Sequence, residues 1–484
     1  MVLISKMLNI QDLRNNLAKY GQEHLLQFWD SLTNSEKEEL IRDIDEMNLE
    51  AVVHDFQKAT SISKTEEKFD NNMKPVPKSL FGNVNTTSIN TLKSYEEEGL
   101  RLISENKIAA LVLAGGQGTR LGVSYPKGMF DVGLPSHKSL FQLQAERILK
   151  LQELACKNNS KQGAITWFIM VGESTMQPTI DFLKKKQYFG LEEKNVVIFK
   201  QFMLPAFTFD GQIFLEKKHK IAMSPDGNGG IYRALKDNKI LDMMEMRGIE
   251  YVHIFSIDNI LLKVGDPIFI GYCIKQKADC AVKVIEKVIP DEPIGIVCMV
   301  NEKWQVIEYS EISQKTTEKR ADDGSLLFKA GNICNHIFKS SFLRKIAENY
   351  IPEIKLHIAK KKIKFVDKDG TQVSPKVPNG IKMEKFIFDV FPFAEKLVVW
   401  DVNRDEEFSA LKNSDEVGKD CPSSARKDIY RLHKKWIEKA GGKFDEEDVV
   451  CEISPLLSYS GEGLEKIVEG QIFSSPLYLK SPCD

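Results

Sequence analysis

The chain has 484 residues, of which 42% are hydrophobic and 28% charged, so it is long enough for two or three modules that each bury a core. Its 67 basic and 69 acidic residues nearly cancel to a net charge of -2, which excludes a chain-wide field that would recruit nucleic acid or an anionic membrane. Any binding of phosphate must therefore be local.

Cysteine usage and the first residues of the chain indicate where the protein works. The eight cysteines have no Cys-x-x-Cys spacing and no histidine at zinc-ligand spacing, which favours reduced and mostly buried thiols. The opening MVLISKML lacks the apolar core of a signal peptide, Val2 excludes myristoylation, and no apolar run approaches the roughly 18 residues of a membrane span. The sequence thus predicts a cytoplasmic protein that binds neither nucleic acid nor membrane.

The N-terminal part of the chain has a helical pattern. Residues 8–60 carry leucines at helical spacing, and Asn34-Ser35 before EKEELI has the form of a helix start. This pattern predicts a helical region that packs on the rest of the chain, with a partner-binding helix as the alternative. From 61 to 92 the periodicity is lost while Ser, Asn, Lys and Pro accumulate, which predicts a linker. We therefore expect residues 1–100 to form a helical N-terminal region with its linker.

A glycine-rich loop follows a buried strand predicted at 108–113. Its glycines let backbone N–H groups approach a ligand closely and let the chain take positive φ, which suits an anion such as phosphate. These glycines are Gly115, Gly116, Gly118 and Gly122. Arg120 and Lys127 add two cations, which disfavours a merely structural turn. The glycine spacing misses the dinucleotide motif by one residue and no P-loop sequence occurs, so neither a Rossmann dehydrogenase nor a P-loop ATPase is supported.

Strand-like runs alternate with amphipathic segments from residue 101 to about 395. The strand-like runs lie at 165–171, 195–199, 251–257 and 280–286, and the amphipathic segments include 139–153 and 174–187. The alternation predicts an α/β fold with a mostly parallel sheet covered by helices, in which ligands bind at the carboxyl ends of strands. After residue 396, a strand-like run at 397–400 and a helix-like stretch at 424–439 predict a small C-terminal domain, 396–484.

Two further polar stretches could carry chemistry. Pro225-Asp226-Gly227 is a turn by itself, but here Asn228 and two more glycines open onto a helix-like run, leaving bare backbone and one amide at its N-terminus. Asp258 ends the strand-like run at 251–257, where a carboxylate is suited to hold Mg²⁺. The alternative for Asp258 is a loop-starting residue that caps backbone N–H groups.

The loop also carries a family likeness. The run LAGGQGTRLG at 113–122, followed by YPKG at 125–128, resembles the signature of the eukaryotic UDP-N-acetylhexosamine pyrophosphorylases, which are sugar-nucleotide uridylyltransferases. The likeness extends over nearly the whole chain. It implies a Rossmann-like nucleotidyltransferase sheet in a central catalytic domain at 101–395.

The resemblance also implies roles for individual residues. The implied catalytic residues are Arg120, Lys127 and Lys382. The implied nucleotide contacts are Leu113, Ala114, Gly115, Gly116, Gln201, Gly227 and Asp258. Mg²⁺, for which Mn²⁺ can substitute, would lie at Asp258. The implied sugar contacts are Asn228, Glu308, Tyr309, Asn332 and Lys412. Without the resemblance, most of the sugar-side residues would be interpreted as strand residues, a turn amide and a surface lysine.

The implied reaction joins UTP and N-acetylglucosamine 1-phosphate to give UDP-N-acetylglucosamine and pyrophosphate, by in-line attack of the sugar phosphate on the α-phosphorus. UDP-N-acetylgalactosamine is a further implied product, and chitin, N-glycan and GPI-anchor precursors are the implied use. The partners are then small-molecule substrates, and the chain acts as a monomer or homodimer. Two departures concern the C-terminal contacts: Ala410 stands where the family has proline, and the segment 441–451 is short for an animal member.

Two other classes of protein stay open. A related enzyme acting on UDP-glucose or on several sugars would differ in whether the pocket of Asn228, Glu308 and Asn332 accepts an N-acetyl group. A non-catalytic UDP-sugar sensor would keep the fold, but it would not need all of the cations and the carboxylate described above.

Overall fold

The computed structural model describes residues 10–62 and 69–484 of the chain. Residues 1–9, which include the opening segment used above, and residues 63–68 of the predicted linker lie outside the described residues. Contacts divide the chain into two units: the first joins the N-terminal segment to Phe202–Ile231 and Glu353–Asp389, and the second contains the rest. The three domains predicted from the sequence stay a prediction.

The first unit combines helices with small sheets. Its helices are α1 (Ile10–Lys19), α2 (Asn34–Glu46) and α3 (Leu49–Ile62). Helix α2 begins where the sequence predicted, because the Thr33 side chain accepts from the Glu36 N–H and the Glu36 carboxylate accepts from the Thr33 N–H. Leucines of this helical region, such as Leu17 and Leu40, share one core with Phe207 and Met383 from the strands. The predicted helical region is therefore present over the described residues.

The strands of the first unit come from distant parts of the sequence. One sheet has the order β16 (His357–Lys361), β19 (Gly380–Glu384) and β7 (Phe207–Thr208). Three pairs complete the unit: β6 (Met203–Pro205) with β10 (Met223–Pro225), β8 (Leu215–Lys217) with β9 (Lys220–Ile221), and β17 (Phe365–Val366) with β18 (Gln372–Val373).

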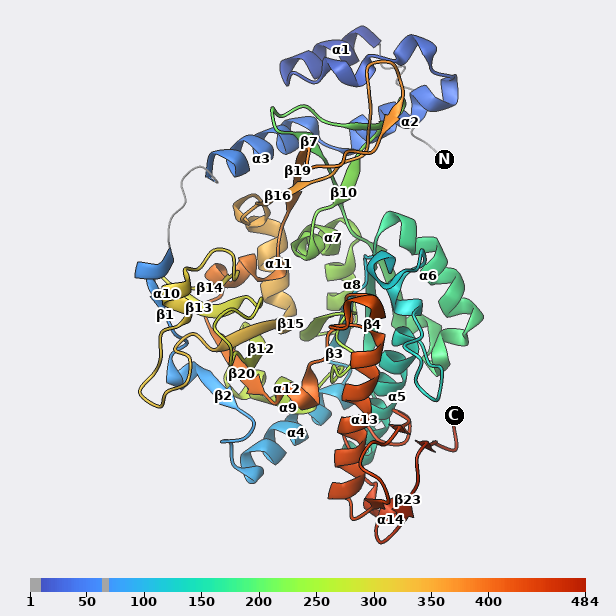
Figure 1. Ribbon diagram of the computed structural model, residues 1–484, viewed down its shortest axis with the longest axis vertical. Coiled ribbons are helices and arrows are strands. Elements are labelled where there is room, and N and C mark those ends of the chain that lie inside the picture. The colour runs from blue at the N-terminus through green and yellow to red at the C-terminus, as the bar shows by residue number, and fades with distance from the viewer. Residues whose placement is uncertain (1–9, 63–68) are drawn as a thin grey trace. The chain divides into compact units, whose positions relative to one another are not determined.

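The second unit is built on an 11-stranded sheet (Figure 1). The order along its main path is β2 (Phe81–Asn83), β20 (Leu397–Val402), β12 (Cys280–Glu286), β15 (Ala330–Lys339), β11 (Tyr251–Ser256), β3 (Ile108–Leu113), β4 (Thr166–Val171) and β5 (Val196–Lys200). Strands β11, β3, β4 and β5 run parallel, and β15 is antiparallel to both of its neighbours. The fold-class prediction is confirmed, because the sheet is mostly parallel.

Three shorter strands extend this sheet beside β15. Strand β13 (Ile296–Val300) pairs with β15, with β14 (Lys303–Ile307) and with β1 (Met73–Lys74). Strands β1 and β2 lie in the segment predicted as a linker. They are too short to show periodicity, and their pairing partners are more than 200 residues away in the sequence.

Helices cover the sheet. The main ones are α4 (Ile89–Ser104), α5 (Leu140–Asn159), α6 (Glu173–Lys185), α9 (Pro267–Lys275) and α11 (Ser340–Asn349), with the short α7 (Ile231–Asp237) and α8 (Ile240–Met246). Helix α4 packs on α5 and α9, while α6 contacts β4 and β5 and α11 contacts β15. The α4–α9 crossing is close because it occurs at glycines: a Cβ on Gly271 would lie 1.9 Å from the Tyr95 carbonyl oxygen.

The C-terminal part of the second unit begins after β20. It contains α12 (Arg404–Glu407), α13 (Pro422–Lys439), α14 (Glu465–Val468), β21 (Lys443–Phe444) paired with β23 (Ile472–Phe473), and β22 (Cys451–Ile453) paired with β24 (Leu477–Leu479). A separate small core joins α13 to these strands through residues such as Ile437 and Val468. The predicted helix at 424–439 lies within α13.

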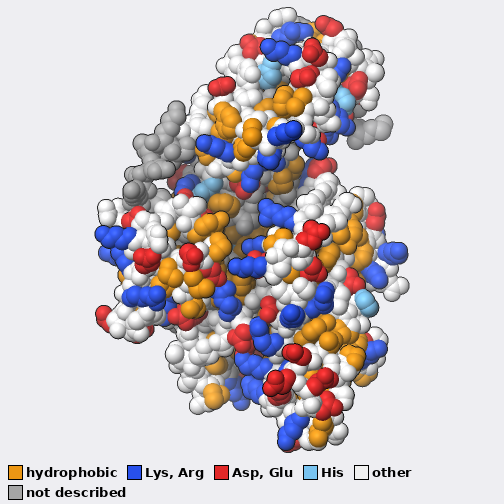
Figure 2. All heavy atoms as spheres, viewed as in Figure 1, with side chains coloured by type: hydrophobic (Ala, Val, Ile, Leu, Met, Phe, Trp, Pro, Cys, Tyr) orange, Lys and Arg blue, Asp and Glu red, His pale blue; other side chains and the backbone are white. Residues whose placement is uncertain are grey.

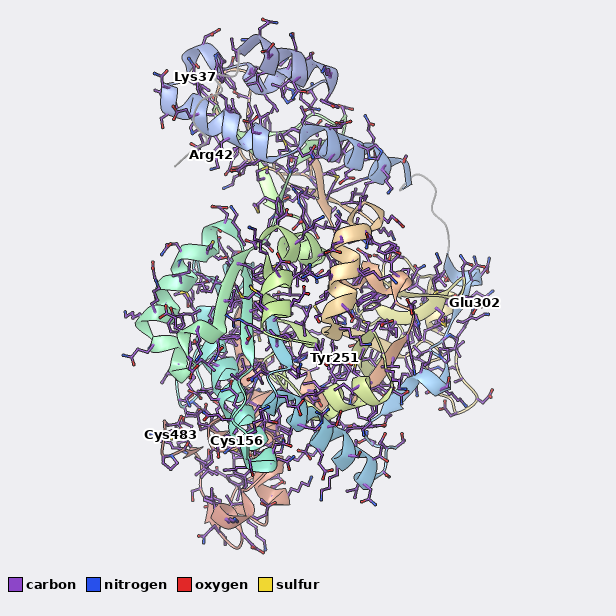
Figure 3. All side chains as sticks on the ribbon, turned by 180° about the vertical axis from the view of Figure 1, so that it is seen from behind. Lys37, Arg42, Cys156, Tyr251, Glu302 and Cys483 are labelled. Carbon is purple, nitrogen blue, oxygen red and sulfur yellow. The ribbon has the colours of Figure 1, made fainter. Side chains whose placement is uncertain are left out.

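The surface charges and the cysteines are distributed as the composition leads us to expect. Basic and acidic side chains are interspersed over the face shown in Figure 2. None of the helices in the described part of the chain combines the length and apolar character that a membrane crossing requires. All eight cysteines lie in the described residues, and none of them forms a disulfide. Burial raises the pKa of Cys273, Cys298 and Cys451 to about 12, so these thiols stay protonated. Of the two labelled in Figure 3, Cys156 is half-buried and Cys483 exposed.

Candidate active site

The candidate site of the second unit lies where parallel strands end. Strands β11, β3, β4 and β5 have the same direction, so their carboxyl ends share one edge of the sheet. The loops that leave this edge contain the glycine-rich segment after Leu113, the turn at Asp258, and Gly172 and Gln201. The position of the glycine loop at a carboxyl edge agrees with the prediction.

The beginning of the glycine loop is held against both neighbouring strands. The Ala114 N–H donates to the Met170 carbonyl at 2.9 Å, and the Ile257 N–H donates to the Leu113 carbonyl at 3.3 Å. Both Leu113 and Ala114 are buried. Their contribution to a ligand would therefore come through backbone groups.

Gly115 and Gln201 are brought together. A Cβ on Gly115 would lie 2.5 Å from Gln201 Oε1, and a Cβ on Gly172 would lie 2.7 Å from the Gly115 carbonyl oxygen. Gln201 is buried, and its N–H donates to the Val171 carbonyl at 2.8 Å. Gly115 thus allows a close packing that a side chain would obstruct, whereas a Cβ on Gly116 would meet open space.

Lys127 and Asp258, which the sequence singled out separately, form an ion pair. Lys127 is 8% exposed, and its Nζ lies 2.6 Å from Asp258 Oδ1. The same Nζ donates to the Leu411 carbonyl oxygen, and the Lys127 N–H donates to the Gly116 carbonyl at 3.3 Å. The lysine therefore ties the glycine loop to the turn after β11 and to the C-terminal segment. Sequence reasoning missed Leu411, because a backbone carbonyl has no sequence signature.

Arg120 has a different environment. It lies in a short 3₁₀ turn, Thr119–Leu121, and its side chain is exposed. Within the described residues, no carboxylate forms an ion pair with its guanidinium. Arg120 thus presents an uncompensated cation close in sequence to the buried Lys127.

The segment that carries Lys412 lies beside Asp258. The Leu411 N–H donates to the Asp258 carbonyl at 2.8 Å, and Ala410 bridges to Asn259. Ala410 is buried, while Lys412 is exposed and its N–H donates to the Asp420 carbonyl at 2.7 Å. The structure therefore brings Lys412 into the neighbourhood of the Lys127–Asp258 pair. The effects predicted from Ala410 and from the short 441–451 segment stay predictions.

Two predicted sugar residues flank Gly295. The Asn332 N–H donates to the Gly295 carbonyl at 2.8 Å, and a Cβ on Gly295 would lie 2.9 Å from Glu308 Oε1. Both side chains are half-buried, and Tyr309 next to Glu308 is 51% exposed. Glu308, Tyr309 and Asn332 therefore form one group, although 22 residues separate Asn332 from the nearest of them.

Three predicted residues, Gly227, Asn228 and Lys382, belong to the first unit. Gly227 has φ +84° and packs against backbone, because a Cβ there would lie 2.3 Å from the Lys385 carbonyl oxygen. The side-chain oxygen of Asn228 accepts from the Ile387 N–H at 2.9 Å. The glycine-rich turn thus packs on the segment that follows β19, and Lys382 is part of β19, opposite Ala359.

The acidic groups suit a metal held largely by substrate. No cluster of three His, Cys, Asp or Glu side chains able to hold a metal occurs in residues 10–62 and 69–484. Asp258 is a single carboxylate whose side chain is 33% exposed and whose Oδ1 contacts Lys127. Mg²⁺ commonly takes one or two carboxylates and completes its shell with phosphate oxygens and waters, which this site fits.

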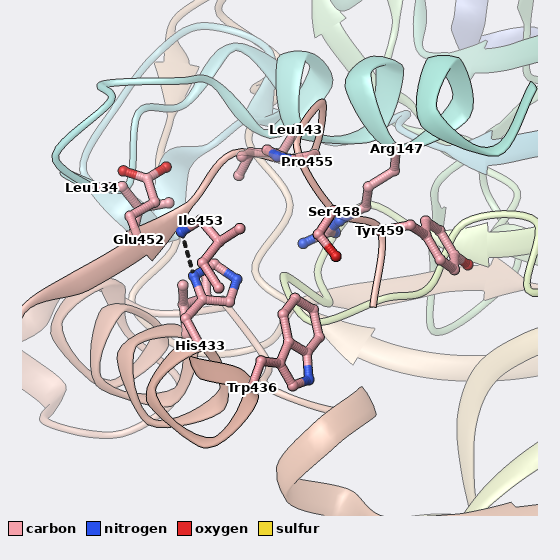
Figure 4. Close-up of a pocket in the computed structure, with 11 residues that line it drawn as sticks. Leu134, Leu143, Arg147, His433, Trp436, Glu452, Ile453, Pro455, Ser458 and Tyr459 are labelled. Carbon is pink, nitrogen blue, oxygen red and sulfur yellow. Dashed lines mark hydrogen bonds between the residues drawn. The ribbon is translucent and has the colours of Figure 1, made fainter. Parts of the chain in front are cut away.

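A small polar cavity lies elsewhere in the second unit (Figure 4). Its volume is about 20 Å³, enough for roughly one water molecule. Residues of α5, α13 and the C-terminal segment line it, among them Arg147, His433 and Tyr459, and the Ile453 N–H donates to His433 Nδ1 at 3.0 Å. None of the predicted site residues lines this cavity, which is too small for a nucleotide.

Comparison with known proteins identifies the family. The profile of the family described as UTP--glucose-1-phosphate uridylyltransferase matches residues 49–447. The chain belongs to this uridylyltransferase family. Families of this kind generally use a divalent metal, and their substrates are a nucleotide and a sugar phosphate.

Individual relatives show which members of the family this uridylyltransferase resembles. The chain is 46% identical to the human UDP-N-acetylhexosamine pyrophosphorylase-like protein 1, with 97% of each chain covered. It is 38% identical to UDP-N-acetylglucosamine pyrophosphorylase of Saccharomyces cerevisiae, with 96% of this chain and 98% of the relative covered. Among solved structures, the fold matches the crystal structure of uridine diphosphate N-acetylglucosamine pyrophosphorylase from Trypanosoma brucei in complex with inhibitor. This match covers 100% of both chains, at 27% identity and a TM-score of 0.84. The predicted family is confirmed.

Proposed function

We propose that this uridylyltransferase makes UDP-N-acetylglucosamine and pyrophosphate from UTP and N-acetylglucosamine 1-phosphate. The observation that supports the proposal most strongly is the Lys127–Asp258 pair at the carboxyl edge of the sheet, beside a glycine loop that also presents Arg120. The names of the relatives support the N-acetylated sugar. UDP-N-acetylgalactosamine would be a second product, since the two sugars differ in the orientation of one hydroxyl.

The reaction needs positioning and charge stabilisation rather than a protein nucleophile. The sugar phosphate attacks the α-phosphorus of UTP in line, and pyrophosphate leaves with added negative charge. In our proposal Arg120, Lys127 and Lys382 stabilise the charge on the phosphates. Backbone groups of the loop and the Gln201 amide would orient the nucleotide. The proposed nucleotide contacts are those of Leu113, Ala114, Gly115, Gly116, Gln201, Gly227 and Asp258.

Asp258 is the residue that would hold a divalent metal, which we propose to be Mg²⁺ with Mn²⁺ as a substitute. When bound, such an ion would neutralise phosphate oxygens of the substrates. Lys127 shares the Asp258 carboxylate, so the chain already supplies a cation at this position. The contact with Lys127 is at Oδ1, and the second carboxylate oxygen of Asp258 would be the main ligand for a metal.

We assign sugar binding to Asn228, Glu308, Tyr309, Asn332 and Lys412. Glu308 and Asn332 flank Gly295, where hydrogen-bonding groups could select an N-acetyl amide. We further propose a cytoplasmic monomer or homodimer that binds small molecules rather than nucleic acid or membrane and supplies precursors of chitin, N-glycans and GPI anchors. The three domains 1–100, 101–395 and 396–484 are part of the same proposal.

The test is pyrophosphate release from UTP and Mg²⁺ by the purified protein. N-acetylglucosamine 1-phosphate, N-acetylgalactosamine 1-phosphate and glucose 1-phosphate are compared at equal concentrations. We expect strong release with the N-acetylated sugars and little with glucose 1-phosphate.

A UDP-glucose enzyme is the second candidate, because the matched family is described by glucose 1-phosphate. Preference for glucose 1-phosphate would keep the uridylyl transfer and overturn the sugar assignment. Folded protein that binds UDP-sugar but is silent with all three sugars would overturn the transferase proposal in favour of a UDP-sugar sensor.

A further inference from the structure

A group of four charged side chains is connected to the Asp258 turn through Glu407, and three of the four, all except the half-buried Lys263, are buried. Lys283 Nζ lies 2.6 Å from Asp266 Oδ2 and 2.6 Å from Glu407 Oε2, and Lys263 Nζ lies 3.3 Å from Glu407 Oε1. The Lys283 side chain is 0% exposed and both carboxylates are 6% exposed. We call these four residues the buried charge cluster. Two lysines and two carboxylates balance its formal charge.

The cluster has an unusual location for charged groups. Lys283 is in the middle of β12, among apolar residues, and its Nζ lies 5.1 Å from the centre of the Phe269 ring. Asp266 caps the N-terminus of α9 by accepting from the Ile268 N–H. Burial disfavours its charge, but Lys283 and Lys263 hold the pKa of Asp266 below its ordinary value. Buried ion pairs often add little net stability, because the cost of burying two charges offsets their attraction.

Glu407 connects this cluster to the segment that runs beside Asp258. It is the last residue of α12, and its carbonyl accepts from Asn259 Nδ2 at 2.7 Å. Asn259 Oδ1 in turn accepts from the Ser409 N–H at 3.0 Å, and the Ile260 N–H donates to the Ser409 carbonyl at 3.1 Å. Residues 407–411 and 258–260 therefore form one hydrogen-bonded pair of segments. The Glu407 side chain fixes this pair to Lys283 of β12, which also binds Asp266 at the start of α9.

One end of this pair of segments contacts the Lys127 side chain. The Leu411 N–H donates to the Asp258 carbonyl at 2.8 Å, and the Leu411 carbonyl accepts from Lys127 Nζ. Asp258 Oδ1 accepts from the same Nζ. The position of the lysine ammonium thus depends on two acceptors, one from each segment. A shift of 407–411 would move one acceptor away from Lys127.

We infer that Lys283 and Glu407 are positioning residues for Lys127: the buried charge cluster holds residues 407–411 against Asp258–Ile260, and this contact sets where the Lys127 ammonium lies. The inference rests on the proposed function, since it assigns the cluster to the phosphate-binding lysine. Neither positioning residue is among the proposed substrate contacts. Their effect on the reaction passes through the Leu411 carbonyl.

Glu407→Gln is the first variant to examine, because it removes the charge while keeping the backbone carbonyl that Asn259 binds. The matched control is Glu146→Gln, which breaks another buried ion pair, Lys138–Glu146 at 2.7 Å, with side chains 6% and 4% exposed. That pair connects to Ser454 and Asp484 rather than to the Asp258 segment. Both variants are expected to lower the melting temperature.

The catalytic readout is kcat for pyrophosphate release well below the melting temperature, together with the Kd of UTP. We expect Glu407→Gln to lower kcat about tenfold to hundredfold with a change in Kd of less than about twofold, and Glu146→Gln to leave kcat within about twofold. In a Lys127→Ala background, Glu407→Gln should lower kcat by less than about twofold, because the group it positions is gone. Equal losses in both backgrounds would overturn the inference.

A second variant addresses failure to fold. The double variant Lys283→Met, Glu407→Gln keeps the Lys263–Asp266 charges balanced and is expected to fold, since buried ion pairs tolerate neutral replacements of similar shape. Its kcat should also be lowered about tenfold. Wild-type kcat in the folded double variant would contradict the positioning role.

A crystal structure of the double variant gives a readout that does not depend on activity. We expect the Lys127 Nζ to leave the Leu411 carbonyl, with a separation beyond about 3.5 Å. An unchanged contact would overturn the inference even if the wild-type protein released no pyrophosphate. An inactive wild-type protein with a shifted Lys127 in the variant would instead refute only the proposed function.

Discussion

The two cations at the glycine loop have opposite environments. Lys127 is buried and already bound to Asp258 Oδ1 and to the Leu411 carbonyl. Arg120 is exposed, and the described part of the chain offers its guanidinium no carboxylate. A cation whose position the protein fixes can stabilise developing charge without reorganising, whereas a free cation must be ordered by the ligand. The same loop therefore contains one cation that the protein holds in place, Lys127, and one that substrate would have to order, Arg120.

Removing the prepositioned cation should have the largest effect. We expect Lys127→Ala to lower kcat/KM about a thousandfold and to lower stability by about 1–3 kcal/mol, because the Leu411 carbonyl loses its donor. Pyrophosphate release and thermal melting measure the two effects. Lys157→Ala, at an exposed lysine of α5, is the control. A Lys127→Ala protein with near-normal turnover would remove this lysine from the mechanism.

Replacing Asp258, the ion-pair partner of Lys127, should have the next-largest effect. Asp258→Asn should lower kcat a few hundredfold at most and raise the Mg²⁺ concentration needed for half-maximal activity, since an amide is a poorer ligand for a hard cation. A Mg²⁺ titration of wild type and variant measures this. An unchanged Mg²⁺ dependence would mean that Asp258 serves only to hold Lys127.

The exposed cation should affect activity without affecting stability. We expect Arg120→Ala to lower kcat/KM about a hundredfold and to leave the melting temperature unchanged, since no ion pair of the described chain is lost. With saturating UDP-sugar present, wild type should gain more in melting temperature than the variant. If Arg120→Ala destabilises the unliganded protein as much as Lys127→Ala does, the contrast between the two cations is wrong.

A smaller effect is expected where the loop packs on Gln201. Gly115→Ala places a Cβ 2.5 Å from Gln201 Oε1, and the long side chain can move, so we expect a loss of about 1 kcal/mol and a KM for UTP raised about fivefold. The control is Lys157→Ala, at an exposed lysine of α5 that lies outside the proposed site. Equal KM values for the two variants would argue against a role of Gln201 in holding the nucleotide.

Local patterns predicted the parts of the fold that depend on short stretches of sequence. The buried run at 108–113 became β3, the alternation after it became a mostly parallel sheet, and Asn34 begins α2 because Thr33 caps it. Strands β1 and β2 were missed within the predicted linker, because their partners are distant in sequence.

The candidate site was predictable to a similar degree. The glycine-loop motif identified Lys127, and the end of the strand-like run at 251–257 identified Asp258. The structure joins these two candidates in an ion pair. Their third partner, the Leu411 carbonyl, leaves no trace in the sequence. The buried charge cluster did leave a sign, since Lys283 interrupts the apolar run CAVKVIE, but its two carboxylates approach only through tertiary packing.

The most direct test of the central claim is a single turnover with UTP, Mg²⁺ and N-acetylglucosamine 1-phosphate, run on wild type and Lys127→Ala with enzyme in excess. We expect wild type to form UDP-N-acetylglucosamine and pyrophosphate in equal amounts, and the variant to form the same products about a thousandfold more slowly from a complex that binds UTP with similar affinity. No product from folded wild type, or equal rates for both proteins, would contradict the claim that Lys127 is placed to stabilise the phosphates during uridylyl transfer.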